Sequence, residues 1–483
     1  MDNVLVIGAG PTGLAAACGL REAGIEVRVL DGAAGPAMTS RALGLQPRGV
    51  EVLRRLGALG DLPQRAMPID KVVMTVNGRE LVRLWVGAAM RRLGVQPGMV
   101  ISQAEIERAL RERLTKLGGA VEWGRPVSGL QVRAEGVTVL VDDGDDVDAG
   151  WVIGADGAHS VVRKALNIDF PGMPLVEQFL LADVHADLNQ PHDAACTWVN
   201  GYELLAAFPL PGEDLWRLMA PAPTDFADKP AQDAIIDFLG GRLREEAGAT
   251  IRSTEWTSSF RIQQRLADTY RRGRVLLAGD AAHIHSPLGG QGMNTGIGDA
   301  ENLAWKLALV ISGRAAERLL DTYEMERRPI AKKVLESTTG LTRLVVSSNA
   351  VARLVRDHVA LPLLSRTWTQ RLIARRASQL RVNYRGGPLG AGRRRLLPGL
   401  QVGDRVAGPD GLHDALGPAW ALIGAESLAE VARERLGEVV TVPGHGDALL
   451  VRPDGHLAWR GNSAAGLRQW LDDALGRPVE VPV

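Results

Sequence analysis

The first thirty residues of the chain alternate apolar runs with a glycine turn. Residues 4–7 are continuously apolar, which predicts a buried parallel strand. Residues 14–23 are rich in alanine and leucine and predict a helix. A second apolar run at 26–30 predicts another strand, which ends at Asp31. Strand, helix and strand in this order form a βαβ unit.

The hydrophobic period changes several times in the rest of the chain. Residues 105–117 carry apolar residues at helical spacing. From about 170 to 270, short apolar alternations are broken by proline and glycine, which predicts an antiparallel sheet with short helices. Residues 274–278 have the pattern of a buried strand, and residues 293–312 are apolar at helical spacing. We therefore expect the chain to return to its first domain after residue 270.

These patterns predict an α/β fold with interleaved domains. Residues 1–170 and 271–330 are expected to form one Rossmann-like domain, and residues 171–270 an antiparallel-sheet domain inserted between them. Residues 331–398 are expected to form a helical tract that ends in a linker rich in glycine, arginine and proline. Residues 399–483 are expected to form a small α/β unit.

Composition excludes several classes of protein. The 483 residues are 46% hydrophobic and 23% charged, and the 56 Lys and Arg balance the 56 Asp and Glu, so neither nucleic acid nor a membrane is expected as a partner. No apolar run approaches the length of a membrane span. Cys18 and Cys196 are too few for a zinc site or a CxxC pair. The first residues do not resemble a secretion signal, so we expect a cytoplasmic protein.

The glycine turn matches the fingerprint of a dinucleotide site. It reads Gly8-Ala9-Gly10-Pro11-Thr12-Gly13, which satisfies G-x-G-x-x-G between a predicted strand and a predicted helix. The first glycine makes the turn, the second admits a pyrophosphate, and the third lets the helix pack on the strand. Asp31 follows at the end of the next strand, where a carboxylate can bind a ribose. A glycine turn kept only for packing is the alternative, and the motif does not distinguish NAD from FAD.

Two later segments decide between these dinucleotides. Residues 154–163 contain Gly-Ala-Asp-Gly, residues 274–283 contain Gly-Asp-Ala-Ala-His, and each segment includes or follows a predicted strand. Together with the first glycine turn, they resemble the three fingerprints of the class A flavoprotein monooxygenases, the aromatic hydroxylases with the para-hydroxybenzoate hydroxylase fold. The resemblance covers about residues 1–385. It implies a Rossmann-like FAD-binding domain interleaved with a substrate-binding sheet domain.

The resemblance also implies which residues bind FAD. Arg41 is expected beside the flavin, Gln103 and Asp280 on the ribityl chain, and the backbone amides of residues 285–294 at the flavin pyrimidine. Asp280 could instead cap a short helix, and the glycine-rich loop could be a plain surface loop. The Asp-Gly segment is expected to contact both flavin and pyridine nucleotide through Asp156 and Arg163, with an ordinary ion pair between these two residues as the alternative. The full set of expected cofactor-binding residues is Gly8, Gly10, Pro11, Thr12, Gly13, Asp31, Arg41, Gln103, Asp156, Asp280, Gly290, Gln291, Gly292, Met293 and Asn294.

The implied activity is that of an FAD-dependent monooxygenase that consumes NADPH or NADH. One oxygen atom from O2 would enter a polycyclic aromatic or polyketide-like substrate through a C4a-hydroperoxyflavin. The expected catalyst is the flavin, supported by the loop that contains Pro287, Gly290 and Gly292, because a helix terminus stabilises negative charge on the reduced ring. A flavin-dependent dehydrogenase or reductase of the same fold and a non-catalytic flavoprotein partner are the alternatives.

Aromatic and sulfur-containing residues of the middle sheet are candidates for the substrate pocket. They are Trp198, Tyr202, Phe208, Trp216 and Met219. The G-x-S-x-G elbow of hydrolases is absent from the sequence. His159, His283 and His285 are not accompanied by paired carboxylates, so no metal is expected.

The C-terminal segment resembles the thioredoxin-like appendage of larger family members, such as aromatic polyketide hydroxylases and rifampicin monooxygenases. Residues 399–483 contain no cysteine, which excludes a redox role for this segment. We expect it to serve in packing, in contacts within a homodimer, or in solubility. Its removal is expected to leave FAD bound to residues 1–385.

Overall fold

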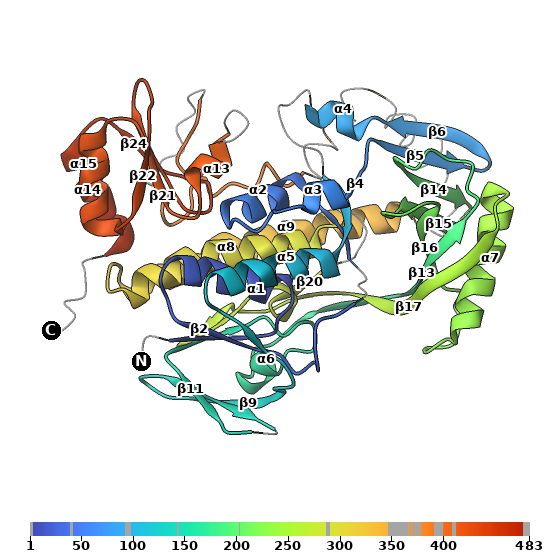
Figure 1. Cartoon of the computed structure of the whole chain (residues 1–483), viewed down its shortest axis with the longest axis horizontal. Helices are drawn as coiled ribbons and strands as arrows, with labels where there is room; N and C mark the ends of the chain where they lie inside the picture. The colour runs from blue at the N-terminus through green and yellow to red at the C-terminus, as the bar shows by residue number, and fades with distance from the viewer. Residues whose placement is uncertain are drawn as a thin grey trace.

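Two large β-sheets organise the chain (Figure 1). The computed structural model describes residues 3–38, 42–91, 98–142, 144–201, 203–285, 290–345, 366, 369, 372, 378–390, 399–407 and 412–476. Among the helices in these parts of the chain, none combines the length and the hydropathy needed to cross a membrane.

The first large sheet contains the predicted βαβ unit. In spatial order its strands are β18 (Arg271–Arg272), β19 (Val275–Leu277), β12 (Trp151–Gly154), β1 (Val4–Ile7), β2 (Val27–Leu30) and β8 (Val121–Glu122). The strands from β19 to β8 are parallel, and every residue of β1 is buried. Parallel sheets are covered on both faces, which explains the continuously apolar strands. The chain does return to this sheet after residue 270, as the pattern predicts.

Helices and a smaller sheet cover the first sheet. The helices of this part are α1 (Pro11–Glu22), α2 (Pro47–Arg55), α3 (Leu62–Arg65), α5 (Gln103–Lys116), α6 (Val161–Ala165) and α8 (Gly292–Ile311). Helix α4 (Val86–Arg91) instead contacts β5 (Lys71–Val76) of the second large sheet (Figure 1). The smaller sheet consists of β11 (Val147–Ala149), β10 (Val137–Val141) and β9 (Val127–Val132), and a short one of β3 (Leu43–Leu45), β7 (Met99–Ser102) and β4 (Met67–Pro68). Helix α1 packs against α8 and α5, which places both of the predicted glycine-led helices on the same side of the sheet (Figure 1).

The second large sheet is mainly antiparallel. Its order is β20 (His283–Ile284), β17 (Ile251–Leu266), β13 (Gly172–Ala186), β16 (Leu215–Pro221), β15 (Glu203–Pro209), β14 (Ala194–Asn200), β5 (Lys71–Val76) and β6 (Arg79–Leu84). Helix α7 (Gln232–Ala247) covers one of its faces (Figure 1). The sequence places this sheet within residues 171–270, but the hairpin of β5 and β6 also belongs to it. That hairpin joins because β5 pairs in parallel with β14, a long-range contact that no local pattern reveals.

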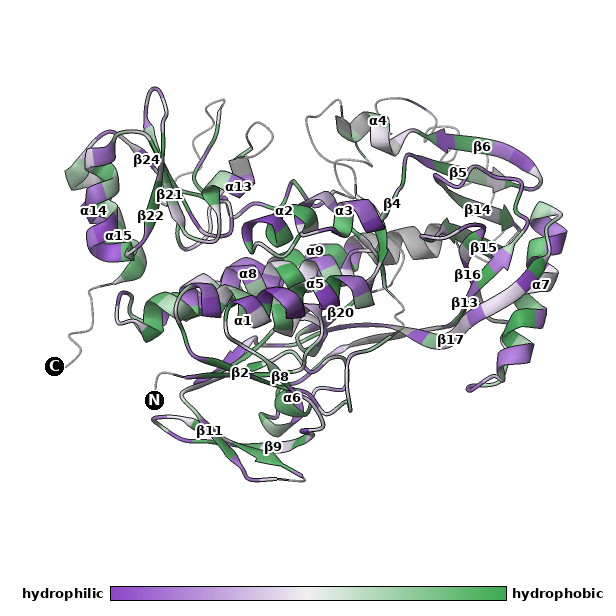
Figure 2. Cartoon of the chain, viewed as in Figure 1, coloured by the Kyte–Doolittle hydropathy of each residue, from purple (hydrophilic) through white to green (hydrophobic). Residues whose placement is uncertain are grey.

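The remaining elements connect the first large sheet and its helices to the C-terminal unit. The 3-10 helices are η1 (Gly279–Ala281) and η2 (Glu317–Leu320), and the long helix is α9 (Asp321–Val345). The C-terminal sheet has the order β22 (Val439–Val442), β21 (Trp420–Ile423), β23 (Ala448–Val451) and β24 (Leu457–Gly461), with α13 (Leu412–Leu416), α14 (Glu426–Leu436) and α15 (Ala464–Leu475). Its strands are mainly hydrophobic, whereas α14 mixes hydrophobic and hydrophilic residues along its length (Figure 2). A resemblance of this unit to thioredoxin stays a prediction.

The C-terminal unit shares its hydrophobic core with α8. Trp305 of α8 meets Trp420 edge to face, with ring centroids 5.2 Å apart, and Trp470 packs against the other side of Trp420. Close by, Arg452 donates two hydrogen bonds of 2.8 Å to Glu326 of α9. Both side chains are almost fully buried. The unit is therefore an integral part of the fold, and we replace the expectation that FAD stays bound to residues 1–385 without it by the prediction that follows.

We predict that a chain ended at residue 398 does not form a soluble, cooperatively folding protein. The truncation exposes Trp305 and leaves Glu326 without its arginine, and breaking a buried ion pair costs about 3–5 kcal/mol. That loss is comparable to the whole stability of many domains. Expression followed by thermal unfolding tests this, and a soluble truncated chain with a single sharp transition would contradict it.

Candidate active site

The three glycines of the first turn have different surroundings. A Cβ atom on Gly8 would lie 2.4 Å from the carbonyl oxygen of Ala155, and one on Gly13 would lie 1.9 Å from that of Gly8. Gly8 also has a φ of +104°, which disfavours other residues. In contrast, a Cβ on Gly10 would meet no atom within 4 Å. Packing therefore explains the first and third glycines, whereas the second faces open space, as a pyrophosphate site requires.

Helix α1 presents its first backbone amides to this open space. Gly10 is its N-cap and contributes no side chain, and Pro11 stands in the first turn, where its missing N–H is harmless. Asp31 fixes the turn from the side, because its carboxylate accepts hydrogen bonds from the amides of Ala9 (2.7 Å) and Ala33 (2.8 Å). A carboxylate has about four acceptor positions, so Asp31 can bind a ribose as well. Thr12 packs against Gly279 and Gly296. A Cβ atom added to either glycine would lie within about 2.5 Å of the Thr12 hydroxyl.

Asp280 lies in η1, directly after β19. Its carboxylate has no hydrogen-bond partner among the described residues, and its side chain is exposed. The surrounding protein nevertheless desolvates the carboxylate and raises its pKa. The alternative role as a helix cap is wrong, because Ala278 is the N-cap and Asp280 lies inside the helix.

The start of α8 forms another wall of the site. Gly290 has a φ of +61°, Gly292 faces open space, and the N-cap Gln291 makes no side-chain capping bond. The side chain of Asn294 is buried, and its partners among the described residues are backbone groups: it donates to the carbonyls of Gly44 (3.2 Å) and Gly290 (2.9 Å). Its Oδ1 accepts from the amide of Gln46 at 2.8 Å. Asn294 therefore holds the loop in place rather than offering its side chain to a ligand.

Gln103 and Met293 occupy supporting positions. Gln103 begins α5, and its Nε2 donates to Glu107 at 2.7 Å. Burial raises the pKa of Glu107. Met293 is partly buried and packs against the core of the first sheet. Arg41 and Pro287 lie outside the described residues, so their predicted places beside the flavin stay predictions.

His283 and Asp299 form a buried pair that supports η1. The sequence analysis missed this pair. Nε2 of His283 lies 2.5 Å from Oδ2 of Asp299, which also accepts from the amide of Gly279 at 3.2 Å. Arg327 donates to Oδ1 of Asp299 at 2.7 Å. Burial would raise the pKa of Asp299, but His283 and Arg327 outweigh it and hold the pKa below its ordinary value. The only sequence signal was an aspartate within the apolar helical run of residues 293–312.

The segment that contains Asp156 and Arg163 binds backbone rather than forming an ion pair. Asp156 accepts from the amides of Val161 (2.7 Å) and Val162 (3.2 Å) at the start of α6. The guanidinium of Arg163 donates to the carbonyl of Ala281 at 2.8 Å. The alternative of a direct ion pair between Asp156 and Arg163 is therefore wrong. Arg163 instead connects α6 to η1, next to Asp280.

Comparison with known proteins identifies the family. Residues 1–338 match the family described as "FAD binding domain", and residues 400–478 match "Aromatic-ring hydroxylase, C-terminal". The chain belongs to the FAD-dependent aromatic-ring hydroxylases. This monooxygenase thus has the cofactor that the three fingerprints imply.

Individual relatives agree with this assignment over nearly the full length. The chain is 36% identical to 6-methylpretetramide 4-monooxygenase of Streptomyces rimosus, covering 95% of this chain and 90% of the relative. It is 35% identical to a rifampicin monooxygenase of Streptomyces venezuelae, covering 95% and 96%. The solved structure of an anhydrotetracycline hydroxylase from Streptomyces rimosus is similar with a TM-score of 0.79, 33% identity and 99% coverage of both chains. The predicted fold class is confirmed.

Residues of the monooxygenase's middle sheet divide between its two faces. Trp198 and Trp216 are buried in the cluster that includes Leu239 of α7, which corrects their interpretation as pocket walls. Phe208 and Met219 belong to the cluster on the opposite face. The reason is that successive side chains of a strand point to opposite faces, which the spacing of aromatic residues alone could not orient. Tyr202 lies outside the described residues.

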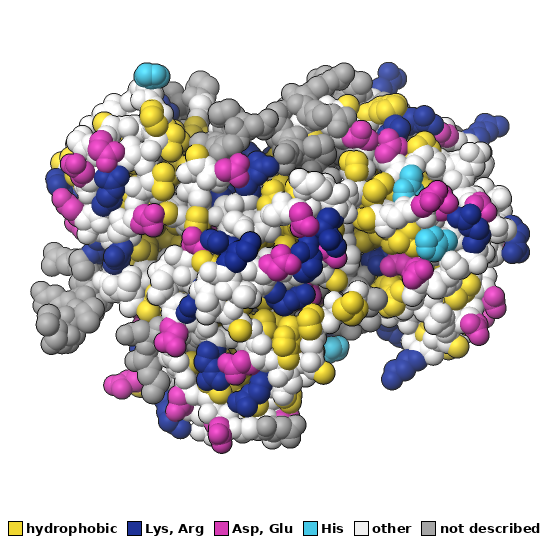
Figure 3. Space-filling model, in the orientation of Figure 1, with side chains coloured by type: hydrophobic (Ala, Val, Ile, Leu, Met, Phe, Trp, Pro, Cys, Tyr) yellow, Lys and Arg dark blue, Asp and Glu magenta, His cyan; other side chains and the backbone are white. Residues whose placement is uncertain are grey.

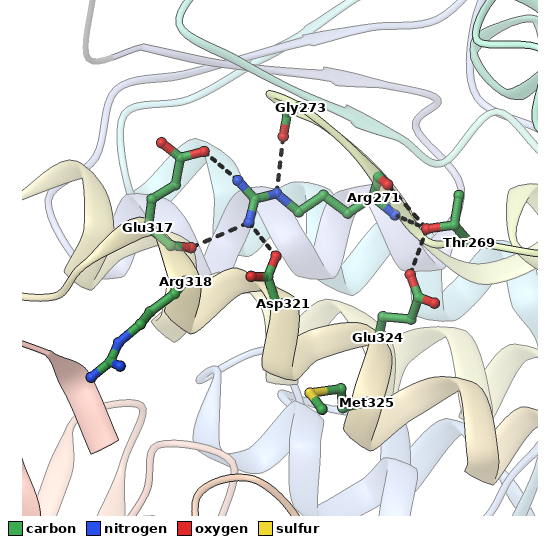
Figure 4. Close-up of a pocket in the computed structure, with 8 residues that line it drawn as sticks. All are labelled: Thr269, Arg271, Gly273, Glu317, Arg318, Asp321, Glu324 and Met325. Atoms are coloured by element: carbon green, nitrogen blue, oxygen red, sulfur yellow. Dashed lines mark hydrogen bonds and ion pairs between the residues drawn. The ribbon is translucent and has the colours of Figure 1, made fainter. Parts of the chain in front are cut away.

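A cavity of about 570 Å³ lies elsewhere, at the start of α9 (Figure 4). Arg271 occupies its centre and is already bound to Glu317, Asp321 (2.7 Å) and the carbonyl of Gly273 (2.9 Å). Glu324 accepts from the hydroxyl of Thr269 at 2.6 Å. These charges bind each other, and none of the predicted site residues lines the cavity. On the face shown in Figure 3, basic and acidic side chains are likewise interspersed. In the described residues, no group of three metal-ligating side chains is arranged to hold a metal.

We predict that Gly10→Val abolishes FAD binding while the protein stays folded. The new side chain enters empty space that the pyrophosphate needs, and Gly10 has an ordinary φ of −72°. Gly13→Ala is the matched control, because its Cβ collides with the backbone of Gly8 and should lower the melting temperature itself. Flavin absorbance after gel filtration and thermal unfolding measure the two effects. Retention of FAD by Gly10→Val would contradict the assignment.

We predict that Asp280→Ala weakens FAD binding by about 1–3 kcal/mol, the usual cost of one lost hydrogen bond to a charged group. Its melting temperature without FAD should change little, because the carboxylate has no protein partner among the described residues. Asp280→Asn keeps an acceptor and should lose less. Titration of the apoprotein with FAD measures the affinities, and unchanged affinity in the alanine variant would remove Asp280 from the site.

Proposed function

We propose that this monooxygenase uses NADPH or NADH to insert one oxygen atom from O2 into a polycyclic aromatic, polyketide-like substrate. The observation that carries the proposal is near full-length similarity, at about 35% identity, to monooxygenases named for 6-methylpretetramide and rifampicin. The similarity extends through the C-terminal unit, so it is not confined to a generic cofactor domain.

We assign a group of this chain to each polar part of FAD. The α1 amides and Gly10 would bind the pyrophosphate, Asp31 the ribose, and Gln103 and Asp280 the ribityl chain. The uncapped amides at the start of α8 would face the ring edge that becomes negative on reduction. Bound FAD would supply the redox chemistry, which comprises electron transfer from the nicotinamide and activation of O2.

The histidines near the site do not act as proton carriers to substrate in this proposal. His283 is fully buried and bound to Asp299, so its role is to hold η1. Burial holds the pKa of His285 well below its ordinary value, so its ring is neutral near pH 7. The protein's contribution is orientation, exclusion of water and stabilisation of charge. Phe208 and Met219 remain our candidates for substrate contacts.

The test is the purified protein loaded with FAD and given NADPH or NADH with a tetracycline-type or rifamycin-type compound. We expect substrate-dependent O2 uptake and a product that carries one atom from isotopically labelled O2. Gly10→Val serves as the control that lacks cofactor. Oxidation of NAD(P)H that needs another acceptor and consumes no O2 would favour the dehydrogenase alternative. Bound FAD without any NAD(P)H oxidation would favour a non-catalytic partner.

A further inference from the structure

The turn between β23 and β24 contains two charged residues, Arg452 and Asp454, that are buried against α8 and α9. Asp454 in this turn is almost fully buried, and its Oδ2 accepts from Asn302 (3.0 Å) and Trp305 (3.3 Å) of α8. Arg452 binds Asp454 and also Glu326 of α9. The C-terminal unit thus holds both long helices from one turn.

The same turn also holds α2, through Arg48. The carbonyl of Asp454 accepts a hydrogen bond from Nη2 of Arg48 at 2.5 Å. Arg48 also donates to Glu51 (3.1 Å) and to Glu301 of α8 (3.3 Å), and its exposed side-chain fraction is 7%. A Cβ on Gly455 would lie only 3.1 Å from Arg55, so the turn approaches α2 as closely as a glycine permits. One arginine therefore connects α2, α8 and the C-terminal turn.

Arg48 stands beside the wall of the flavin site. It lies in the first turn of α2, two residues after Gln46, whose amide binds Asn294. At Gly49 a Cβ would come within 2.4 Å of the Asn294 side chain, so this end of α2 is in tight contact with the start of α8. A displacement of α2 would therefore displace the Gly290–Asn294 loop.

Stability alone does not account for this arrangement. Replacing a buried ion network by well-packed apolar residues is often neutral or stabilising, and the neighbouring tryptophan contact already joins the unit to α8. What a buried arginine adds is geometry, because its planar guanidinium accepts only a few arrangements of partners.

We propose that Arg48, held by Asp454 of the C-terminal unit, is a positioning residue for the flavin site. It sets the position of α2 against α8 and thereby that of the loop which faces the flavin ring. The inference rests on the proposed function, because it assumes that the Gly290–Asn294 loop borders bound FAD. It assigns the C-terminal unit a part in catalysis without any contact with cofactor or substrate.

The test compares Arg48→Met with Arg54→Met in the full-length protein loaded with FAD. Both arginines lie on α2 and face acidic or carbonyl groups of the C-terminal unit, but Arg54 forms an ion pair with the exposed Asp414 at 3.4 Å. In Arg48→Met, Glu301 keeps Arg55 and Glu51 keeps Arg405, so no carboxylate is left without a cation. We expect Arg48→Met to change the visible flavin spectrum and to lower the ratio of oxygenated product to H2O2 about tenfold. Arg54→Met should stay within about twofold of the parent.

Arg48→Lys provides a second, milder variant. It keeps the charge but cannot serve Asp454, Glu51 and Glu301 together, so it should shift the same two readouts in the same direction by a smaller factor. If Arg48→Met does not fold, the flavin spectrum and product ratio of Arg48→Lys test the positioning role instead. A lowered melting temperature with an unchanged spectrum and product ratio would overturn the positioning role. A parent protein that binds no FAD or forms no product would instead contradict the proposed function.

Discussion

Helix α8 is buried along most of its length and yet carries Asp299, Glu301 and Lys306, each of which must meet an opposite charge inside the protein. An unpaired charge in the interior costs several kcal/mol, so these partners constrain every element around the helix. Asp299 binds Arg327 of α9 and His283 of the second sheet, and Glu301 forms ion pairs with Arg48 and Arg55 of α2. Lys306 is paired with Glu326; burial lowers the pKa of the lysine to about 8. The packing of three separate elements, α9, the second sheet and α2, follows from one helix.

Through α8, this constraint connects the candidate cofactor site to the C-terminal unit. The first turn of α8 borders the candidate cofactor site, whereas Trp305, three turns later, belongs to the core of the C-terminal unit. Arg452 and Asp454 complete the charge balance from that unit. The C-terminal unit therefore behaves as part of the interior of the enzyme and not as an appendage on a linker.

The candidate site differs from this interior because it contains groups that have no partner within the described protein. The buried charges of α8 are bound, whereas the exposed Asp280 has no partner in the described residues and Gly10 faces empty space. The large cavity at the start of α9 shows the opposite condition, since Arg271 is saturated by its own neighbours. Groups that the fold leaves without partners, at the carboxyl ends of parallel strands, are where a ligand is expected to bind.

The sequence by itself determined the elements whose contacts are local. The β1–α1–β2 unit and its glycine turn were predicted correctly, because strand period, helix period and turn chemistry all act within about thirty residues. Family resemblance added the fold class and the cofactor. Only the tertiary structure decided which face of the middle sheet Trp198 occupies, and that Arg48 meets Asp454, 406 residues away. Such contacts depend on how whole elements pack, and neither hydrophobic period nor motif spacing contains that information.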